Sequence, residues 1–283
     1  MNFHSEPNVF VRQVDIKVAD LERAIAFYQQ VIGFQILEKQ ERKAVLTADG
    51  KTPLLQIEQP EEVVSKQPRT TGLYHFALLL PTRSDLAKII EHFIKNGYPL
   101  QGASDHLVSE ALYLADPDGN GIEIYTDRPA ESWVWNNGEV HMTTERLDIE
   151  SILAEGDGTP WSGLPAKTVM GHIHLHVADL HAAEQFYCQG LGFEVVTRYG
   201  GQALFISSGG YHHHIGLNTW NGLGAPAPVE NSVGLASYTL IFPNEEAREM
   251  VIERLKRIEV PVSKKDHSYL AKDPSGNLIV LSV

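Results

Sequence analysis

An internal repeat is the feature that most restricts how this chain can fold. The segment "VADLERAIAFYQQVIGF", which begins at Val18, recurs as "VADLHAAEQFYCQGLGF" from Val177, 159 positions later. A second segment, "DPDGNGIEIY" from Asp116, recurs as "DPSGNLIVLS" from Asp273. Because a repeated sequence indicates a repeated structural unit, the chain is predicted to consist of two similar halves.

Each half divides again into two units of one kind. Alternating apolar residues in "VRQVDIKV" predict a strand, and apolar residues at helical spacing in "ADLERAIAFYQQVI" predict a helix capped by Asp20. Strands follow around "KAVLTADG" and "PLLQIEQ", and the turn "DPDGNG" favours a hairpin. The pattern therefore predicts four βαβββ units, at residues 9–59, 72–127, 169–220 and 234–283. The predicted domains are 1–127 and 169–283, with a connector at 128–168.

Composition excludes several classes of partner. The formal net charge of −13 disfavours binding to nucleic acid or to an anionic membrane. The longest apolar runs, such as "FALLL", are too short to span a bilayer, and "MNFHSEPNVF" lacks the pattern of a signal peptide. With Cys188 as the single cysteine, no intrachain disulfide can form, and a cytoplasmic location is expected. Assembly into a homo-oligomer is compatible with the sequence.

Four units that carry "VADL…FY…LGF" and "DPDGNGIEIY" resemble the vicinal-oxygen-chelate superfamily. That superfamily includes glyoxalase I, fosfomycin-resistance proteins and type I extradiol ring-cleavage dioxygenases, and the length is most similar to catechol-2,3-dioxygenase-like proteins. The resemblance implies an α+β fold in which the four units form two curved mixed-sheet cups, with helices on the outside. It also implies metal ligands on the first and last strands of the units.

Period-two alternation predicts which side chains face the cavity of each cup. The candidate metal ligands are His75, Glu123, His172 and His214. The hairpin before the last strand of unit three leaves its alignment open by one residue, so His213 is an alternative to His214. The equivalent positions of units one and four carry Gln13, Gln56, Ser237 and Val280, which are poor ligands for a divalent metal.

This uneven distribution predicts how the units pair. Pairing in chain order would leave a weak ligand set in the first cup and no carboxylate in the second. Pairing of unit two with unit three would instead collect His75, Glu123, His172 and His214 in one cup. We therefore predict that units two and three share a sheet and that units one and four form a metal-free cup.

Other polar side chains are expected around the metal. His174 shares the face of His172, and His174, His212 and His213 are predicted to contact substrate or to orient the ligands. In "DHLVSEALYLADPDGNGIE", His106, Tyr113 and Glu123 follow the order of an extradiol dioxygenase signature, although Ser104 departs from it. The resemblance implies that His106 handles protons or stabilises oxygen and that Tyr113 bonds the substrate hydroxylate.

The predicted function is therefore extradiol ring cleavage of a catechol-type aromatic diol by O₂. Two histidines and one carboxylate suit Fe(II), with Mn(II) as an alternative. A glyoxalase-like lyase or isomerase with a four-ligand Ni(II) or Zn(II) site is a second hypothesis. A binding or resistance protein that sequesters a small aromatic molecule is a third.

Overall fold

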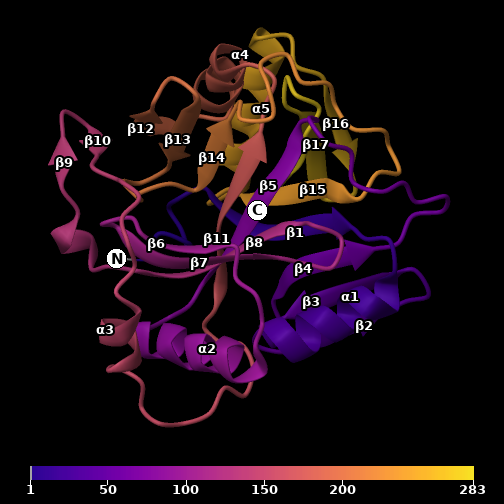
Figure 1. The fold of residues 1–283 in the computed structure, drawn as a ribbon. Helices are drawn as coiled ribbons and strands as arrows, with labels where there is room; N and C mark the ends of the chain where they lie inside the picture. Colours follow the sequence, from indigo (N-terminus) through magenta and orange to yellow (C-terminus); the bar gives the residue numbers. More distant parts are fainter. Residues whose placement is uncertain (1) are drawn as a thin grey trace.

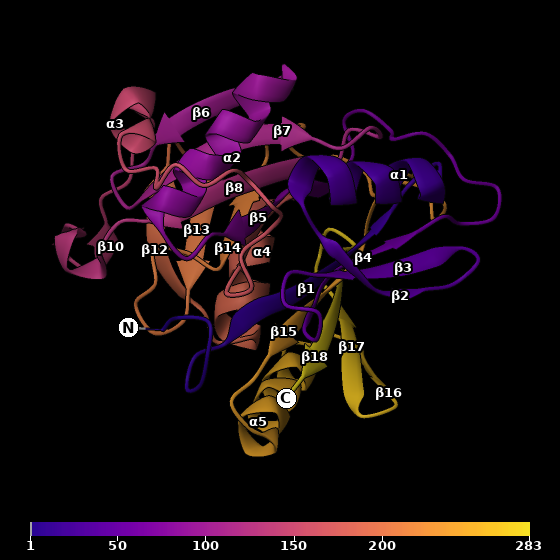
Figure 2. The same cartoon turned by 90° about the horizontal axis from the view of Figure 1, so that it is seen from below.

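The computed structural model describes residues 2–283, which form two large mixed sheets with helices outside them (Figures 1 and 2). The first sheet contains, in spatial order, β16 (Val262–Lys265), β17 (Ser268–Lys272), β18 (Leu278–Ser282), β15 (Gly234–Ile241), β1 (Phe10–Lys17), β4 (Pro53–Glu58), β3 (Lys43–Thr47) and β2 (Gln35–Lys39). The second contains β12 (Glu194–Tyr199), β13 (Ala203–Ser207), β14 (Ile215–Asn218), β11 (Val169–His176), β5 (Gly72–Leu79), β8 (Gly121–Asp127), β7 (Ser109–Ala115) and β6 (Gly102–Asp105). The fold is thus the predicted α+β arrangement of βαβββ units.

The strand order confirms that unit two pairs with unit three. Their first strands, β5 and β11, run antiparallel at the centre of what we call the two-three sheet, with Phe76 opposite Ile173. In the same way β1 and β15 join units one and four at the centre of the one-four sheet, with Val14 opposite Tyr238. Each sheet therefore takes one unit from each half of the sequence.

The helices follow from capped, amphipathic segments. They are α1 (Leu21–Phe27), α2 (Arg83–Asn96), α3 (Ile149–Leu153), α4 (Leu180–Glu184) and α5 (Glu245–Arg257), and π-helical turns at Tyr28–Ile32 and Gln185–Gly190 continue α1 and α4. Asp20 caps α1 as predicted, since its carboxylate accepts a hydrogen bond from the Arg23 N–H at 3.0 Å. Among residues 2–283, no helix combines the length and apolar character needed to cross a membrane.

The two repeated motifs contact each other, which explains why they occur together. The Tyr28 hydroxyl, from the first helical segment, donates to the Asp116 carboxylate of the unit-two turn at 3.0 Å. Tyr187 donates to Asp273 of the unit-four turn at 2.9 Å. Both carboxylates also accept hydrogen bonds within their own turns, from Asn120 and Asn277 respectively. Within each half, a tyrosine–aspartate contact therefore joins the two units, whereas each sheet joins units from different halves.

The N-terminal segment and the connector cover one end of the two-three sheet. Phe3 is buried in a small apolar cluster, where its ring lies 5.4 Å from that of Trp133 and 5.0 Å from that of Tyr211. The connector also forms a short hairpin from β9 (Trp135–Asn136) and β10 (Glu139–Val140). Trp133 lies just before this hairpin, so the connector packs on the sheet instead of spanning open solvent.

Candidate metal centre and active site

Three buried side chains of the two-three sheet converge on one point. They are His75 on β5, Glu123 on β8 and His172 on β11, and one ligand atom from each lies within 4.8 Å of the others. Glu123 Oε2 is 3.0 Å from His75 Nε2 and 3.1 Å from His172 Nε2. The structure thus brings together three of the four predicted metal ligands, from both halves of the chain.

The register of three neighbouring strands produces this convergence. Ala77 in the central strand β5 pairs with Glu123 on one side and with His172 on the other, so all three side chains share a face. Because Ala77 ends at its methyl group, the longer side chains of Glu123 and His172 can meet above it. His75 joins them from two residues earlier on the same face of β5.

The donor set fits a divalent metal ion. Within the described chain, His75 Nε2 is buried without a hydrogen-bond partner, although it lies 3.0 Å from a carboxylate oxygen of Glu123. Buried imidazole nitrogens are normally hydrogen-bonded, and a ligated cation is the alternative that satisfies convergent nitrogen and carboxylate lone pairs. Two histidines and one carboxylate on one face match the facial arrangement of non-haem Fe(II) sites, which leaves positions open for other ligands.

Burial sets the protonation states that a metal site requires. Burial lowers the pKa of His172 to about 4, against the opposing charge of Glu123, so its imidazole is neutral at neutral pH. Burial alone would raise the pKa of Glu123, but the neighbouring imidazoles of His172 and His75 outweigh burial and hold that pKa well below its usual value. A neutral imidazole and an ionised carboxylate are the forms that bind metal.

The three converging groups lie in a cavity of about 360 Å³. Of the other predicted site residues, those that line this cavity are His106, Tyr113, His174 and His213. A volume in this range is typical of small-molecule sites, and the cavity combines apolar walls with a few convergent polar groups. It is therefore the candidate active site.

His106 and Tyr113 form a hydrogen-bonded pair beside Glu123. The distance from His106 Nε2 to the Tyr113 hydroxyl is 2.6 Å, and His106 Nδ1 lies 2.6 Å from the Thr143 carbonyl oxygen. Because a carbonyl can only accept, His106 donates from Nδ1 and its Nε2 accepts the Tyr113 proton. Burial and the charge of Glu123 raise the pKa of Tyr113 well above its ordinary value, so the phenol stays protonated.

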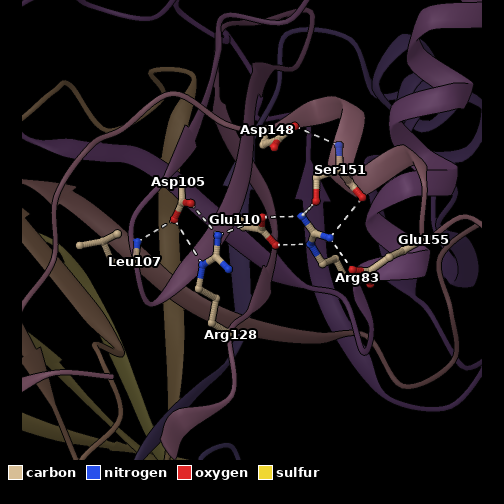
Figure 3. A network of polar contacts seen from close by, with 8 residues as sticks. All are labelled: Arg83, Asp105, Leu107, Glu110, Arg128, Asp148, Ser151 and Glu155. Atoms are coloured by element: carbon tan, nitrogen blue, oxygen red, sulfur yellow. Dashed lines mark hydrogen bonds and ion pairs between the residues drawn. The ribbon is translucent and has the colours of Figure 1, made fainter. Parts of the chain in front are cut away.

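A network of charged side chains holds the loop that carries His106 (Figure 3). Buried Glu110 accepts hydrogen bonds from Arg83 at 2.7 Å and from Arg128 at 3.1 Å. Arg128 also binds Asp105 at 2.6 Å, and Asp105 accepts from the Leu107 N–H at 2.8 Å. Leu107 has a φ of 67°, which is costly for a leucine, and these contacts on both sides of His106 maintain that conformation.

A second chain of imidazoles reaches the cavity through His213. His212 Nε2 lies 2.8 Å from the Asp127 carboxylate, and its Nδ1 lies 2.8 Å from Nδ1 of His213. Since the carboxylate accepts, His212 donates from Nε2 and accepts at Nδ1, so His213 donates from its own Nδ1. This leaves Nε2 of His213 as a free acceptor, on a ring centred 4.1 Å from the ring of His172. His212 itself does not line the cavity and contacts His213 from behind it.

Asn218 orients the remaining histidines of β11. Its amide nitrogen is 3.0 Å from His174 Nε2 and its amide oxygen is 2.7 Å from His176 Nδ1. His174 packs flat over Gly216, where a Cβ atom would come within 2.8 Å of the imidazole. His174 therefore has a fixed position in the cavity wall, next to the converging groups but outside them.

The structure does not bring His214 to the other three predicted ligands. Its Nε2 lies 3.1 Å from the Phe3 carbonyl oxygen, and its Nδ1 accepts from the Ser208 N–H at 3.3 Å. The prediction assumed strand alternation through His214, but β14 begins at Ile215 and residues 211–214 follow a bent path. The alternative left open at that point, His213, is the side chain that lines the cavity.

Several aromatic residues of the cavity were missed from the sequence. Tyr74, Phe205 and Trp220 line it together with Met142 and Tyr199. A β-bulge opposite His174 and Leu175 leaves Tyr74 of β5 without a paired residue on β11. The bulge interrupts the alternation of β5, which predicts that the Tyr74 side chain points away from the cavity. Trp220 lies just after β14 in a turn rich in glycine and asparagine, and no periodicity applies there.

The one-four sheet carries no comparable cluster. Its central face holds Asp15, which accepts hydrogen bonds from Gln13 at 2.6 Å and from Ser237 at 2.7 Å. Among residues 2–283, the three groups at Glu123 are the single set of histidine, cysteine or acidic side chains close enough to share an ion. The central face of the one-four sheet thus carries Gln13, Asp15 and Ser237 where the two-three sheet carries histidines and a glutamate.

The chain is similar to dioxygenases in sequence and to a glyoxalase in fold. The chain is 46% identical over 285 residues to the catechol-2,3-dioxygenase of Bacillus subtilis, and the alignment covers 100% of this chain and 99% of that protein. It is 29% identical over 122 residues to biphenyl-2,3-diol 1,2-dioxygenase 3 of Rhodococcus globerulus, across 41% of this chain and 64% of that protein. The crystal structure of glyoxalase I from Zea mays has the same fold, with a TM-score of 0.57, 17% identity and coverage of 96% and 92%. A family model matches residues 11–124 and 169–281, so the chain belongs to the Glyoxalase/Bleomycin resistance protein/Dioxygenase superfamily.

Proposed function

We propose that this protein is a metal-dependent extradiol dioxygenase that opens the ring of a catechol-type aromatic diol with O₂. The observation that carries the proposal is the convergence of His75, Glu123 and His172 at the floor of a cavity that also holds His106 and Tyr113. The full-length relative named catechol-2,3-dioxygenase supports the same reaction class.

Fe(II) is the metal that this donor set favours, and Mn(II) is the alternative. His75, Glu123 and His172 would hold the ion, which would lower the pKa of the diol hydroxyls and give the site access to O₂ chemistry. Three ligand atoms converge here, with His214 held elsewhere. That count supports the dioxygenase over a glyoxalase-like lyase, for which four ligands were expected.

The protein's own groups supply proton handling and orientation. His213 offers an unprotonated Nε2 to a substrate hydroxyl, because the chain through His212 to Asp127 fixes its tautomer. The Tyr113 hydroxyl is a donor to a substrate oxygen when it turns from His106, and His106 Nε2 can then take a proton. The aromatic walls exclude water and hold the ring of the diol.

Anaerobic loading with Fe(II), followed by catechol and O₂, tests the proposal. We expect a yellow ring-opened product that contains both atoms of the O₂ consumed. Glu123→Gln should lower activity by roughly 100-fold or more and release the metal on dialysis, because a neutral amide replaces the anionic ligand. Glu38→Gln, at an exposed position on β2, is the matched control.

Two results would count against ring cleavage. One is a fully metal-loaded protein that turns over no diol in a panel of substituted catechols. The other is lactoylglutathione formation from methylglyoxal and glutathione, which would favour the lyase. Retention of an aromatic ligand by the metal-free protein, without turnover in either assay, would favour a binding or resistance protein.

A further inference from the structure

We propose that the site selects diols with an uncharged, apolar ring substituent and discriminates against catechols that carry a carboxylate. This inference rests on the proposed function and concerns the part of the cavity beyond the converging groups. The polar groups already described can contact the diol. The remaining wall decides what the other end of the substrate can be.

The charge of the cavity wall is the first observation. Among the described residues that line the cavity, no lysine, arginine or aspartate occurs, and the one carboxylate is Glu123. A substituent carboxylate would thus enter a half-enclosed site without a cation to pair with, next to an anion. Burying an unpaired charge is costly, so the wall disfavours an acidic substituent.

Three basic side chains near the cavity are already engaged by other groups. Lys66 lies in the neighbourhood of His176, but its ammonium donates to the Gly119 carbonyl at 2.5 Å. Arg83 and Arg128 form ion pairs with Glu110 (Figure 3). None of these three side chains lines the cavity, so none is placed to receive a carboxylate from a substrate.

The aromatic mouth of the cavity is the second observation. Tyr74 and Trp220 are 39% and 44% exposed, and their rings meet edge to face at 5.2 Å. The ring of Trp220 also lies 5.3 Å from that of His174, which Phe205 flanks on another side at 5.5 Å. Exposed aromatic side chains that cluster at a cavity mouth offer apolar contact area to a ligand.

The volume of the cavity leaves room for a ring substituent next to Tyr74 and Trp220. A cavity of about 360 Å³ lies within the range that holds ligands larger than a single small ring. A diol bound at the floor, near His75, would direct a substituent toward Tyr74 and Trp220. An alkyl or aryl group would be desolvated there, and a carboxylate would lose hydration without gaining a cationic partner.

A matched set of substrates tests the inference with the metal-loaded protein. The carboxylate of 3,4-dihydroxyphenylacetate has a neutral isostere in 4-isobutylcatechol and a neutral polar analogue in 3,4-dihydroxyphenylacetamide. We expect kcat/KM for 4-isobutylcatechol to exceed that for the carboxylate by about tenfold or more. It should also exceed that for unsubstituted catechol, and the amide should lie between isobutylcatechol and the carboxylate.

Variants of Trp220 locate the selectivity. Trp220→Ala should reduce the preference for 4-isobutylcatechol over catechol, and Trp220→Arg should shift the preference toward 3,4-dihydroxyphenylacetate. Both changes are made at a half-exposed position, where effects on folding are small. Trp135→Ala, in the exposed β9 hairpin away from the cavity, is the control and should leave the ratios unchanged.

The outcomes separate this inference from the proposed function. Equal or better turnover of the carboxylate, or a preference for unsubstituted catechol, would overturn the inference while ring cleavage stands. If no diol is opened, the proposed function fails. Calorimetric titration of the same ligands into the anaerobic Fe(II)-loaded protein still ranks their affinities, and a preference for the carboxylate there would overturn the selectivity as well.

Discussion

Gly171 shows how a single residue supports the converging groups. It lies in a register shift of β11 directly before His172, and its carbonyl oxygen lies 2.8 Å from His4 Nε2. A Cβ atom at this position would lie 2.0 Å from the hydroxyl oxygen of Tyr125. Tyr125 is fully buried, and its hydroxyl is hydrogen-bonded to the Tyr211 hydroxyl at 2.7 Å, so the ring cannot move aside for a Cβ atom.

Gly171→Ala should therefore destabilise the fold and disturb His172. Overpacking of this kind costs about 1–3 kcal/mol, and we expect a lower urea midpoint together with weaker metal binding. Gly102→Ala is the control, because the nearest atom to its Cβ lies 3.9 Å away. Equal unfolding free energies for the two variants would contradict the tight packing at Gly171.

At the scale of single residues, the sequence predicted correctly which face of the sheet a side chain occupies where the residue lies within a paired strand. His75, Glu123 and His172 lie within paired strands, and alternation placed them on one face. It did not place His213 and His214, because a bend before β14 interrupts the period. The bulges at Gly171 and Tyr74 are set by tertiary packing, which no local pattern of residues reports.

At the scale of elements, the contact between the first helical segment and the turn before β8 occurs once in each half of the chain. Tyr28 and Asp116 are both buried, and burial raises the pKa of Asp116 despite its hydrogen bonds. The matching pair in the second half is Tyr187 and Asp273. The sequence revealed the two motifs as repeats, but it did not reveal that they touch.

Tyr28→Phe tests the strength of this contact. Removal of a hydrogen bond to a buried carboxyl group costs about 1.5–3 kcal/mol when the carboxylate is charged, and we expect that loss in the free energy of unfolding. Tyr199→Phe, at an exposed position on β12, should change stability little. Indistinguishable urea midpoints for the two variants would show that the contact adds no stability.

At the scale of the whole molecule, buried neutral histidines make stability depend on pH. Burial lowers the pKa of His4 and of His214 below the value for an exposed imidazole. The unfolded chain therefore binds more protons than the folded protein as the pH falls below about 6.5. Their contribution to stability is present above that pH and is lost as the pH falls toward the folded-state pKa values.

We expect the metal-free protein, kept in a chelator, to have a lower urea midpoint at pH 5 than at pH 7. His4→Gln should reduce that difference, since the amide can still donate to the Gly171 carbonyl but does not titrate in this range. The exposed His181→Gln is the control. A midpoint that stays constant or rises on acidification would contradict the assignment of neutral buried imidazoles.

The sheet topology predicts the behaviour of a cut chain. Residues 157–160 of the connector are exposed. Cleavage at a protease site inserted after Gly158 would break the covalent link between the two halves. Because β5 pairs with β11 and β1 pairs with β15, the fragments should stay together. We expect one peak at the elution volume of the intact protein in gel filtration, with metal retained. Separate elution of the fragments without denaturant would contradict this topology.

The pairing itself could be predicted from the sequence because ligands are unevenly distributed among the units. Glu123 has no acidic counterpart in unit three, and His172 needs a carboxylate partner from elsewhere in the chain. The angle at which the two sheets meet and the path of residues 2–9 could not be predicted in this way. They depend on packing, such as that of Phe3 against Trp133, which no repeat specifies.

The strand order also has a consequence for synthesis on the ribosome. While the first half of the chain is emerging, β5 carries His75 with one edge unpaired, because its partner β11 has not been made. His172 arrives only after the connector has been translated, so the first half offers two of the three converging groups. Binding of a metal ion by all three groups would therefore require that the growing chain has passed residue 172 and that both of its halves have met.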